Sequence, residues 1–187
     1  ENDQNVETIK IEDEEGLTYL LDKTRDNTDP DKRKENSQSE YSEWCTFIKA
    51  ETEEGTARVT NILDYETAKK DGLVSTLKLA ASITPNMKKA KKEGYNGLHH
   101  YHPAICPEGN RISSFLNGIL EIGNYYINLF DKTVPPPNSI NFITFNTANG
   151  PEIIGYNKRF TYLPVNEQKT ELKRASPQEV LQYINAE

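Results

Sequence analysis

The chain has 187 residues, with 22 lysines and arginines against 29 aspartates and glutamates, a formal net charge of −7, three histidines and two cysteines. The length predicts one domain, and the acidic balance argues against a nucleic-acid partner, because binding the phosphate backbone needs a basic surplus. No apolar run approaches the roughly 18 residues of a membrane span, and two cysteines are too few for a disulfide scaffold.

The first 42 residues are the most polar part of the chain. Residues 1–16 carry seven carboxylates and one lysine, and residues 22–42 contain one apolar side chain, Tyr41. Such a composition buries too little apolar surface to offset the loss of chain entropy. The sequence therefore predicts a partly disordered N-terminal extension over residues 1–42, in which the apolar residues 17–21 dock as a strand or helical turn, and a folded domain over 43–187.

The chain begins at Glu1 without an initiator methionine. A processed product and a cut end look the same in a sequence. The compartment therefore stays open: cytoplasmic if Glu1 is a cut end, secreted or periplasmic if a signal peptide was removed. The sequence leaves the oligomeric state open as well.

Residues 44–63 predict a β-hairpin. Two runs rich in β-branched and aromatic residues, 44–50 and 57–63, flank a polar turn that contains Gly55. Glycine adopts a positive φ angle without strain, which is typical of such turns.

Helical patterns follow the hairpin and surround a single strand. Residues 66–82 have helical composition, and a second helix is expected to begin at Thr84-Pro85 and to end at Gly94. A strand is expected over 95–101. The apolar spacing of residues 113–130 then predicts an amphipathic helix with Ser113 or Ser114 as its N-cap.

The C-terminal part predicts a second hairpin, a further strand and a closing helix. The runs 139–146 and 151–157 flank Asn149-Gly150, a dipeptide typical of hairpin turns. Residues 159–163 add a strand, and S-P-Q-E at 176–179 has the spacing of a capping box with proline at the first helical position. The buried stripe of that helix is expected to consist of Val180, Leu181 and Ile184. The order of elements indicates an α/β (α+β) domain with a mixed central sheet flanked by helices.

All three histidines lie within four residues, His99 to His102. His100 and His102 alternate with Tyr101, so in a strand both imidazoles project to one face and can reach the same ion. Imidazole is a favoured ligand of zinc. Pro103 would end the strand and leave the pair at an open edge, whereas His99 faces the other way and is expected to be structural.

The segment G-L-H-H-Y-H-P, residues 97–103, resembles the G-x-x-H-S/T-H-P motif of the JAB1/MPN (JAMM) metalloprotease family. In that family the two histidines hold a zinc ion together with the aspartate of a following S-x-x-D, and water takes the fourth position. The resemblance covers about residues 40–163. It implies a layered fold like that of cytidine deaminases, a zinc cofactor, and a peptide or protein conjugate as substrate.

The same resemblance implies a general base and an oxyanion donor. Glu43 opens E-W-C-T-F-I, which matches the family's E-x-x-G-φ-φ, with φ apolar, except that Thr46 replaces the glycine. Zinc with three protein ligands lowers the pKa of bound water to roughly 7. Glu43 would carry the water proton to the leaving amine, and Ser114 would donate a hydrogen bond to the oxyanion.

The third zinc ligand is where the chain departs from the family. The usual spacing puts Ser113 at the aspartate position, whereas a longer loop aligns Ser114 with the serine and Asn117 with the aspartate. The second alignment is preferred because Ser114 would then cap the helix. Asn117 lacks the charge of a carboxylate, so weaker zinc binding or an empty site is expected, and Glu108 is an alternative ligand. A catalytically inactive MPN-like binding or scaffold module is therefore the alternative function.

Two other kinds of site are less favoured. The spacing G-x5-H-x-H from Gly94, with Glu108 nearby, is cupin-like, but cupins take a further histidine from a second motif and none follows His102. The lack of other histidines also argues against serine and cysteine triads, because the histidine of such a triad would have to come from residues 99–102. Cys45 lies in an apolar run and is expected in the core, and Cys106 has no evident activating neighbour.

Overall fold

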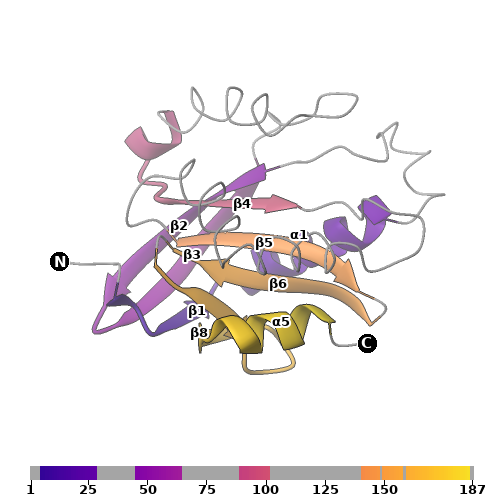
Figure 1. The fold of residues 1–187 in the computed structure, drawn as a ribbon. Helices are drawn as coiled ribbons and strands as arrows, with labels where there is room; N and C mark the ends of the chain where they lie inside the picture. Colours follow the sequence, from indigo (N-terminus) through magenta and orange to yellow (C-terminus); the bar gives the residue numbers. More distant parts are fainter. Residues whose placement is uncertain are drawn as a thin grey trace.

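The computed structural model describes residues 5–28, 45–64, 89–101, 140–147, 149–157 and 159–185. Its strands are Thr8–Ile11 (β1), Cys45–Glu53 (β2), Thr56–Asp64 (β3), Gly97–Tyr101 (β4), Ile140–Thr147 (β5), Gly150–Tyr156 (β6), Thr161–Pro164 (β7) and Glu171–Ala175 (β8). Two helices accompany them, Glu14–Thr28 (α1) and Pro177–Asn185 (α5). The strands close into a barrel in the order β1-β3-β2-β4-β5-β6-β7-β8 (Figure 1).

The short strand β1 closes the barrel. It pairs in parallel with β3 and antiparallel with β8, and its sequence T-I-K-I buries Ile9 and Ile11 while Lys10 stays exposed. The expected fold class, an α/β (α+β) JAB1/MPN-like domain with a mixed sheet between helices, is therefore wrong. The sheet closes on itself, and α-helix in the described segments is confined to α1, α5 and residues 89–92. The prediction fails because it leaves residues 8–11 outside the sheet, which then has two open edges.

Helix α1 is fixed to the barrel by its N-cap, Asp13. One carboxylate oxygen of Asp13 accepts a hydrogen bond from the Gly16 N–H at 2.9 Å, and the other accepts one from the Ile62 N–H of β3 at 2.9 Å. A single side chain thus satisfies a free N–H group of the helix and one of the sheet. Leu17 and Leu21 then pack with the residues of the barrel interior.

The segment expected to be a linker overlaps this helix. Residues 17–21 are helical, and residues 22–28 continue α1 instead of beginning a loop. Helix formation here comes with tertiary packing, since Leu17, Leu20 and Thr24 are all buried. Residues 29–44, and with them the expected boundary between residues 42 and 43, lie outside the described residues.

Both predicted hairpins are confirmed. Strands β2 and β3 meet at Glu54-Gly55, where both residues have a positive φ, 51° and 77°. Strands β5 and β6 meet beside Gly150, with a φ of 111°. The β2–β3 register shifts between Lys49 and Ala50. The side-chain amide of Asn96 stabilises this bulge with two hydrogen bonds. It accepts one from the Ala50 N–H at 2.8 Å and donates one to the Ala50 carbonyl at 2.7 Å.

The predicted helix end at Gly94 is also confirmed. Residues 89–92 are helical, and Gly94 has a φ of 91°, the left-handed conformation typical of a residue just past a helix. The expected start of that helix at Thr84-Pro85 and the helices expected over 66–82 and 113–130 lie outside the described residues. None of the helices in the described segments is long and apolar enough to span a membrane.

Helix α5 begins with the predicted capping box. The Ser176 hydroxyl accepts from the Glu179 N–H at 3.2 Å, and the Glu179 carboxylate accepts from the Ser176 N–H at 3.1 Å. The hydrogen bond from the Ser176 N–H, followed by a hydrogen bond from the Ser176 side chain, lowers the pKa of the Glu179 carboxyl, because each favours its charged form. Val180 is buried as predicted, whereas the side chains of Leu181 and Ile184 are outside the described set.

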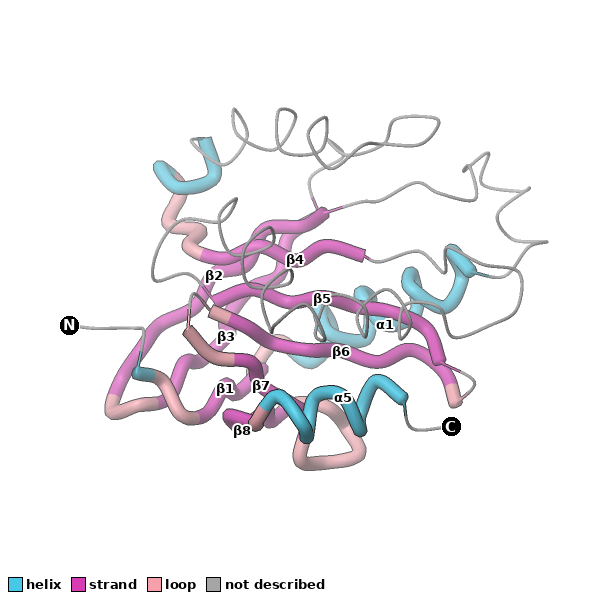
Figure 2. Tube along the Cα trace, viewed as in Figure 1, coloured by secondary structure: helices cyan, strands magenta, loops and turns pink. Residues whose placement is uncertain are grey.

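Alternation along β5 and β6 gives this part of the barrel two packed faces. Phe142 and Ile153 point into the core shared with β1 and α1, whereas Ile143 and Ile154 pack with Val180 of α5. Helix α1 accordingly passes behind β5 and β6 in Figure 1, whereas α5 lies below β6 in this view (Figures 1 and 2). The described chain therefore buries apolar surface on the inside of the barrel and under α5.

The contact between α5 and β6 also contains polar groups. The Tyr183 hydroxyl donates a hydrogen bond to the Glu152 carboxylate, and the Tyr183 ring meets Phe145 edge to face at 6.4 Å between centroids. Burial, followed by the hydrogen bond and the negative charge of Glu152, raises the pKa of Tyr183. Tyr183 thus stays protonated and remains a donor to the sheet.

Candidate functional site

The histidine cluster lies on β4, which matches the strand expected over 95–101 apart from its first two residues. Strand β4 pairs antiparallel with β2 and in parallel with β5. A parallel pair needs a long crossover that leaves from the carboxyl end of the first strand. In this chain that connection is the segment 102–139, which begins directly after Tyr101. The H-x-H-P motif therefore starts at the carboxyl end of β4.

The register between β2 and β4 brings the two predicted motif segments to the same end of the sheet. The Cα partners are Cys45 with His100, Thr46 with His99, Phe47 with Leu98, and Ile48 with Gly97. On β2 the described ladder begins two residues after Glu43, and on β4 it reaches the residue two positions before His102. The described parts of the two motif segments, residues 45–48 and 97–100, are therefore neighbours.

Of the predicted site residues, only His100 lies within a described strand. Its Cα partners are Cys45 on β2 and Ile143 on β5, and its side chain is outside the described set. The other predicted residues lie outside the described segments: Glu43, His102, Ser114, Asn117 and the alternative ligand Glu108. The register places the backbone of His100 opposite the first residue of β2, and the roles of all the predicted site residues, including His100, stay predictions.

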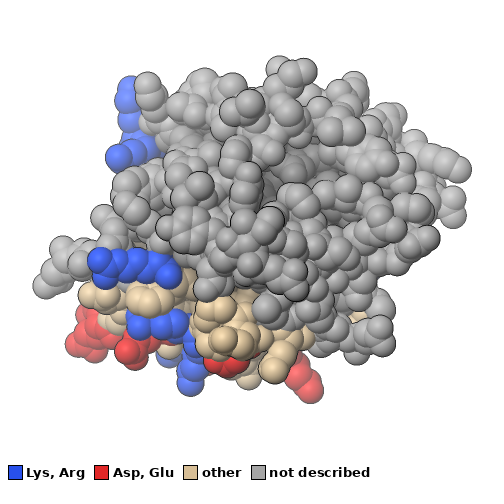
Figure 3. Space-filling view, viewed as in Figure 1, with Lys and Arg blue, Asp and Glu red and all other residues tan. Residues whose placement is uncertain are grey.

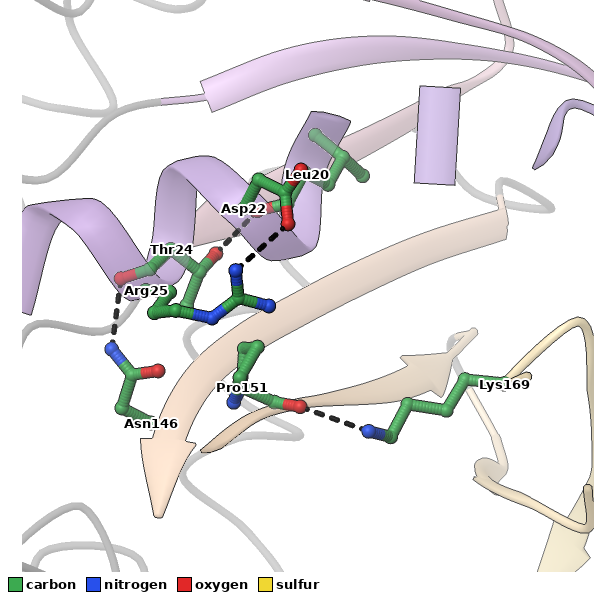
Figure 4. Close-up of polar contacts among 7 residues, drawn as sticks. All are labelled: Leu20, Asp22, Thr24, Arg25, Asn146, Pro151 and Lys169. Atoms are coloured by element: carbon green, nitrogen blue, oxygen red, sulfur yellow. Dashed lines mark hydrogen bonds and ion pairs between the residues drawn. The ribbon is translucent and has the colours of Figure 1, made fainter. Parts of the chain in front are cut away.

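His99 has the structural role that the sequence predicts. It is 0% exposed, and its Nε2 lies 2.7 Å from the Thr144 hydroxyl of β5. The Thr144 hydroxyl lies 2.8 Å from the Thr24 hydroxyl of α1, which lies 2.7 Å from the Leu20 carbonyl. The Thr24 carbonyl in turn accepts a hydrogen bond from Asn146 at 2.8 Å (Figure 4). Polar contacts thus link β4, β5 and α1.

These contacts determine which ring nitrogen of His99 carries a hydrogen. The Leu20 carbonyl can only accept, so the single hydroxyl hydrogen of Thr24 satisfies it. Thr144 then donates to the Thr24 oxygen, and its own oxygen accepts from Nε2 of His99. All three contacts are satisfied together when His99 carries a hydrogen on Nε2.

Thr24 and Thr144 were absent from the residues that the sequence singled out. Threonine is common in strands, and Thr24 falls in the segment expected to be a linker, so residue type gave no signal. Thr46 belongs to the same buried group. It is the register partner of His99, and its hydroxyl has no hydrogen-bond partner among the described residues. The interior next to the histidine strand is therefore polar, whereas most of the barrel interior is apolar.

The described surface carries charges of both signs. Arg58 of β3 and Glu12, which follows β1, form an exposed ion pair at 2.8 Å, and Figure 3 shows lysines and arginines beside aspartates and glutamates. Exposed pairs of this kind contribute about 0–1 kcal/mol to stability. Among the described side chains, no three His, Cys, Asp or Glu groups are arranged to hold a metal ion.

No family model matches the chain, and no curated protein matches it significantly. The resemblance to the JAB1/MPN family therefore stays a prediction that depends on residues 97–103 and Glu43. The β2–β4 register is independent of that resemblance.

Proposed function

We propose that the protein is a zinc-dependent hydrolase of peptide or isopeptide bonds, with the metal held by His100 and His102 at the carboxyl end of β4. The donor set fits zinc, since two imidazoles at i and i+2 of a strand share one face and imidazole is a preferred zinc ligand. The proposal depends on the motif and on strand pairing, and it does not require a layered fold.

The observation that carries the proposal is the pairing of Cys45 with His100. Glu43 and His102 are each two residues from a member of this pair. Consecutive Cα atoms are about 3.8 Å apart, so each is within two such steps of the pair. Continued in the same register, the ladder would pair Glu43 with His102. Directly opposed residues of an antiparallel pair have Cβ atoms about 4.5–5.5 Å apart, which is a suitable separation for a base and a metal ligand that act on one water.

Each residue of the proposed site has one task. Zinc, when bound, would act as a Lewis acid that lowers the pKa of water and polarises a carbonyl. Glu43 accepts the proton of the attacking water and transfers it to the leaving amine. Ser114 donates a hydrogen bond to the carbonyl oxygen as negative charge develops there, and Asn117 is the expected third ligand.

Replacing Glu43 by Gln should lower the rate of hydrolysis by about 10²–10⁴-fold, because an amide cannot accept the proton. Zinc content should be unchanged, since Glu43 is not proposed as a ligand. The measurement is cleavage of a panel of fluorogenic peptides and isopeptides, together with zinc analysis of the same samples. Glu51→Gln, the same substitution at an exposed position of β2, is the matched control and should leave both unchanged. Full hydrolysis by the Glu43→Gln variant would remove Glu43 from the mechanism.

A catalytically inactive binding or scaffold module is the second candidate. One observation favours it: position 117, where the family has a charged ligand, is an asparagine. Two imidazoles and an amide are neutral ligands, so they leave the double charge of zinc uncompensated. They therefore bind zinc more weakly than a set that contains a carboxylate. This candidate predicts no hydrolysis of any member of the panel by the wild-type protein, and no loss of the protein's fold when zinc is removed.

A further inference from the structure

We propose that Asn149 is a site of spontaneous covalent modification, at which the side-chain amide is converted to aspartate and isoaspartate. The inference is independent of the proposed zinc site. The chain contains three Asn-Gly pairs, at 96–97, 117–118 and 149–150. This reaction meets least steric resistance when glycine follows the asparagine, because glycine has no Cβ atom to shield its backbone nitrogen. The pair at 117–118 lies outside the described residues, and the structure distinguishes the other two.

The Asn149-Gly150 pair lies at the turn between β5 and β6, and Asn149 is exposed. A Cβ atom at Gly150 would have no heavy atom within 4 Å, so the surroundings of this glycine leave space for a new ring. Exposed loop tips are also where a folded backbone tolerates change most readily. The side chain of Asn149 can therefore reach the backbone nitrogen of the next residue at little cost to the rest of the fold.

The fold holds the Asn96-Gly97 pair in place. Asn96 is exposed as well, so exposure does not separate the two asparagines. The Asn96 amide accepts a hydrogen bond from the Ala50 N–H at 2.8 Å and donates one to the Ala50 carbonyl at 2.7 Å. Gly97 is buried, and a Cβ atom there would lie 1.9 Å from the carbonyl oxygen of Ile140. Ring closure at Asn96 would break both hydrogen bonds and press against β5, so we expect the fold to protect it.

The reaction at Asn149 needs water and no other co-reactant. The backbone nitrogen of Gly150 loses its proton and attacks the side-chain carbonyl carbon of Asn149, and the bond from that carbon to the amide nitrogen breaks. Ammonia leaves, and a five-membered succinimide ring remains. Water then opens the ring at either carbonyl, which gives aspartate or isoaspartate, and in isoaspartate the backbone runs through the side chain. Each product carries one additional negative charge.

The turn is close to two contacts that fasten the β5–β6 hairpin to its neighbours. The second pair from the turn is Asn146 with Pro151. The Asn146 side chain donates to the Thr24 carbonyl of α1 at 2.8 Å, and Lys169 Nζ donates to the Pro151 carbonyl at 3.0 Å (Figure 4). Isoaspartate lengthens the backbone by one carbon at the turn, so we expect it to loosen this end of the hairpin and both contacts.

Peptide mapping of the full-length protein, aged in mildly alkaline buffer, tests the inference. Isoaspartate should accumulate at Asn149 and stay absent from Asn96 while the protein is folded. In concentrated urea the fold no longer protects Asn96, so both asparagines should be converted at similar rates. Gly150→Ala should slow the conversion of Asn149 in either condition at least about tenfold, which corresponds to a barrier higher by about 1.4 kcal/mol.

Ion exchange separates the products from the unmodified protein by their additional charge. The isoaspartate form should unfold at a lower urea concentration than the Asn149→Asp variant, which carries the same added charge on an unaltered backbone. Equal urea midpoints of these two forms would contradict the loosening of the turn.

Two results would overturn the modification site itself. One is a folded protein in which Asn149 stays intact over a period that converts it fully in urea. The other is a folded protein in which Asn96 is converted as fast as Asn149. Both results come from the wild-type chain, so the comparison decides the matter even when Gly150→Ala fails to fold.

Discussion

Replacing Gly97 by Ala should lower the free energy of unfolding by about 3 kcal/mol, and Gly97→Val by more. A Cβ atom at this position would lie 1.9 Å from the carbonyl oxygen of Ile140 and 3.2 Å from Cβ of Ile48. The closest atom belongs to the backbone of β5, so relief requires β4 and β5 to separate where their parallel pairing begins. Urea unfolding of the variant and of the wild-type protein measures the difference.

Gly55→Ala is the matched control for this substitution. A Cβ atom at Gly55 would have no heavy atom within 4 Å, and the substitution is strained only by the φ of 77°, at a cost of about 1–2 kcal/mol. We expect a clearly larger loss of stability for Gly97→Ala than for Gly55→Ala. A Gly97→Ala variant as stable as the wild-type protein would contradict the close approach of β4 and β5, and with it the position of the histidine strand.

Replacing Thr144 by Val should lower the free energy of unfolding by about 2–3 kcal/mol. Valine keeps the shape of the side chain but removes the hydroxyl that lies 2.7 Å from Nε2 of His99 and 2.8 Å from the Thr24 hydroxyl. A buried polar group that loses its partner costs about 1–3 kcal/mol. The measurement is again the free energy of unfolding in urea.

Thr60→Val, at an exposed position of β3, is the control and should change stability by no more than about 0.5 kcal/mol. The double variant Thr24→Val/Thr144→Val should lose less than the sum of the single losses, because the two hydroxyls share one contact. Equal effects of Thr144→Val and Thr60→Val would show that the contacts of His99 with Thr144 do not stabilise the barrel.

Local signals predicted the local parts of this fold. Gly55 and Asn149-Gly150 marked the two hairpin turns, and S-P-Q-E marked the start of α5, because each pattern acts within a few residues. Closure of the barrel depends on the pairing of β1 with β8, strands of four and five residues, which brings Thr8 opposite Lys173. Four residues give too little periodicity to identify a strand beside an acidic segment.

The candidate site also has one feature that a local pattern predicted and one that depends on distant parts of the chain. Strand alternation correctly predicted that His99 faces the interior in a structural role, whereas the shared face of His100 and His102 stays a prediction. The pairing of Cys45 with His100 could not be predicted, since it depends on which strand lies beside β4 and on the contacts of Asn96 with the bulge at Ala50. Register set by long-range packing is not encoded in the spacing of a motif.

The zinc content of the purified protein tests the proposed zinc site at the carboxyl end of β4. We expect about one zinc ion per chain in the wild-type protein after gel filtration. His100→Ala should lose that zinc, and its urea midpoint reports whether the fold is kept. Less than about 0.2 zinc ions per chain in the zinc-supplemented wild-type protein, with no change in His100→Ala, would contradict it.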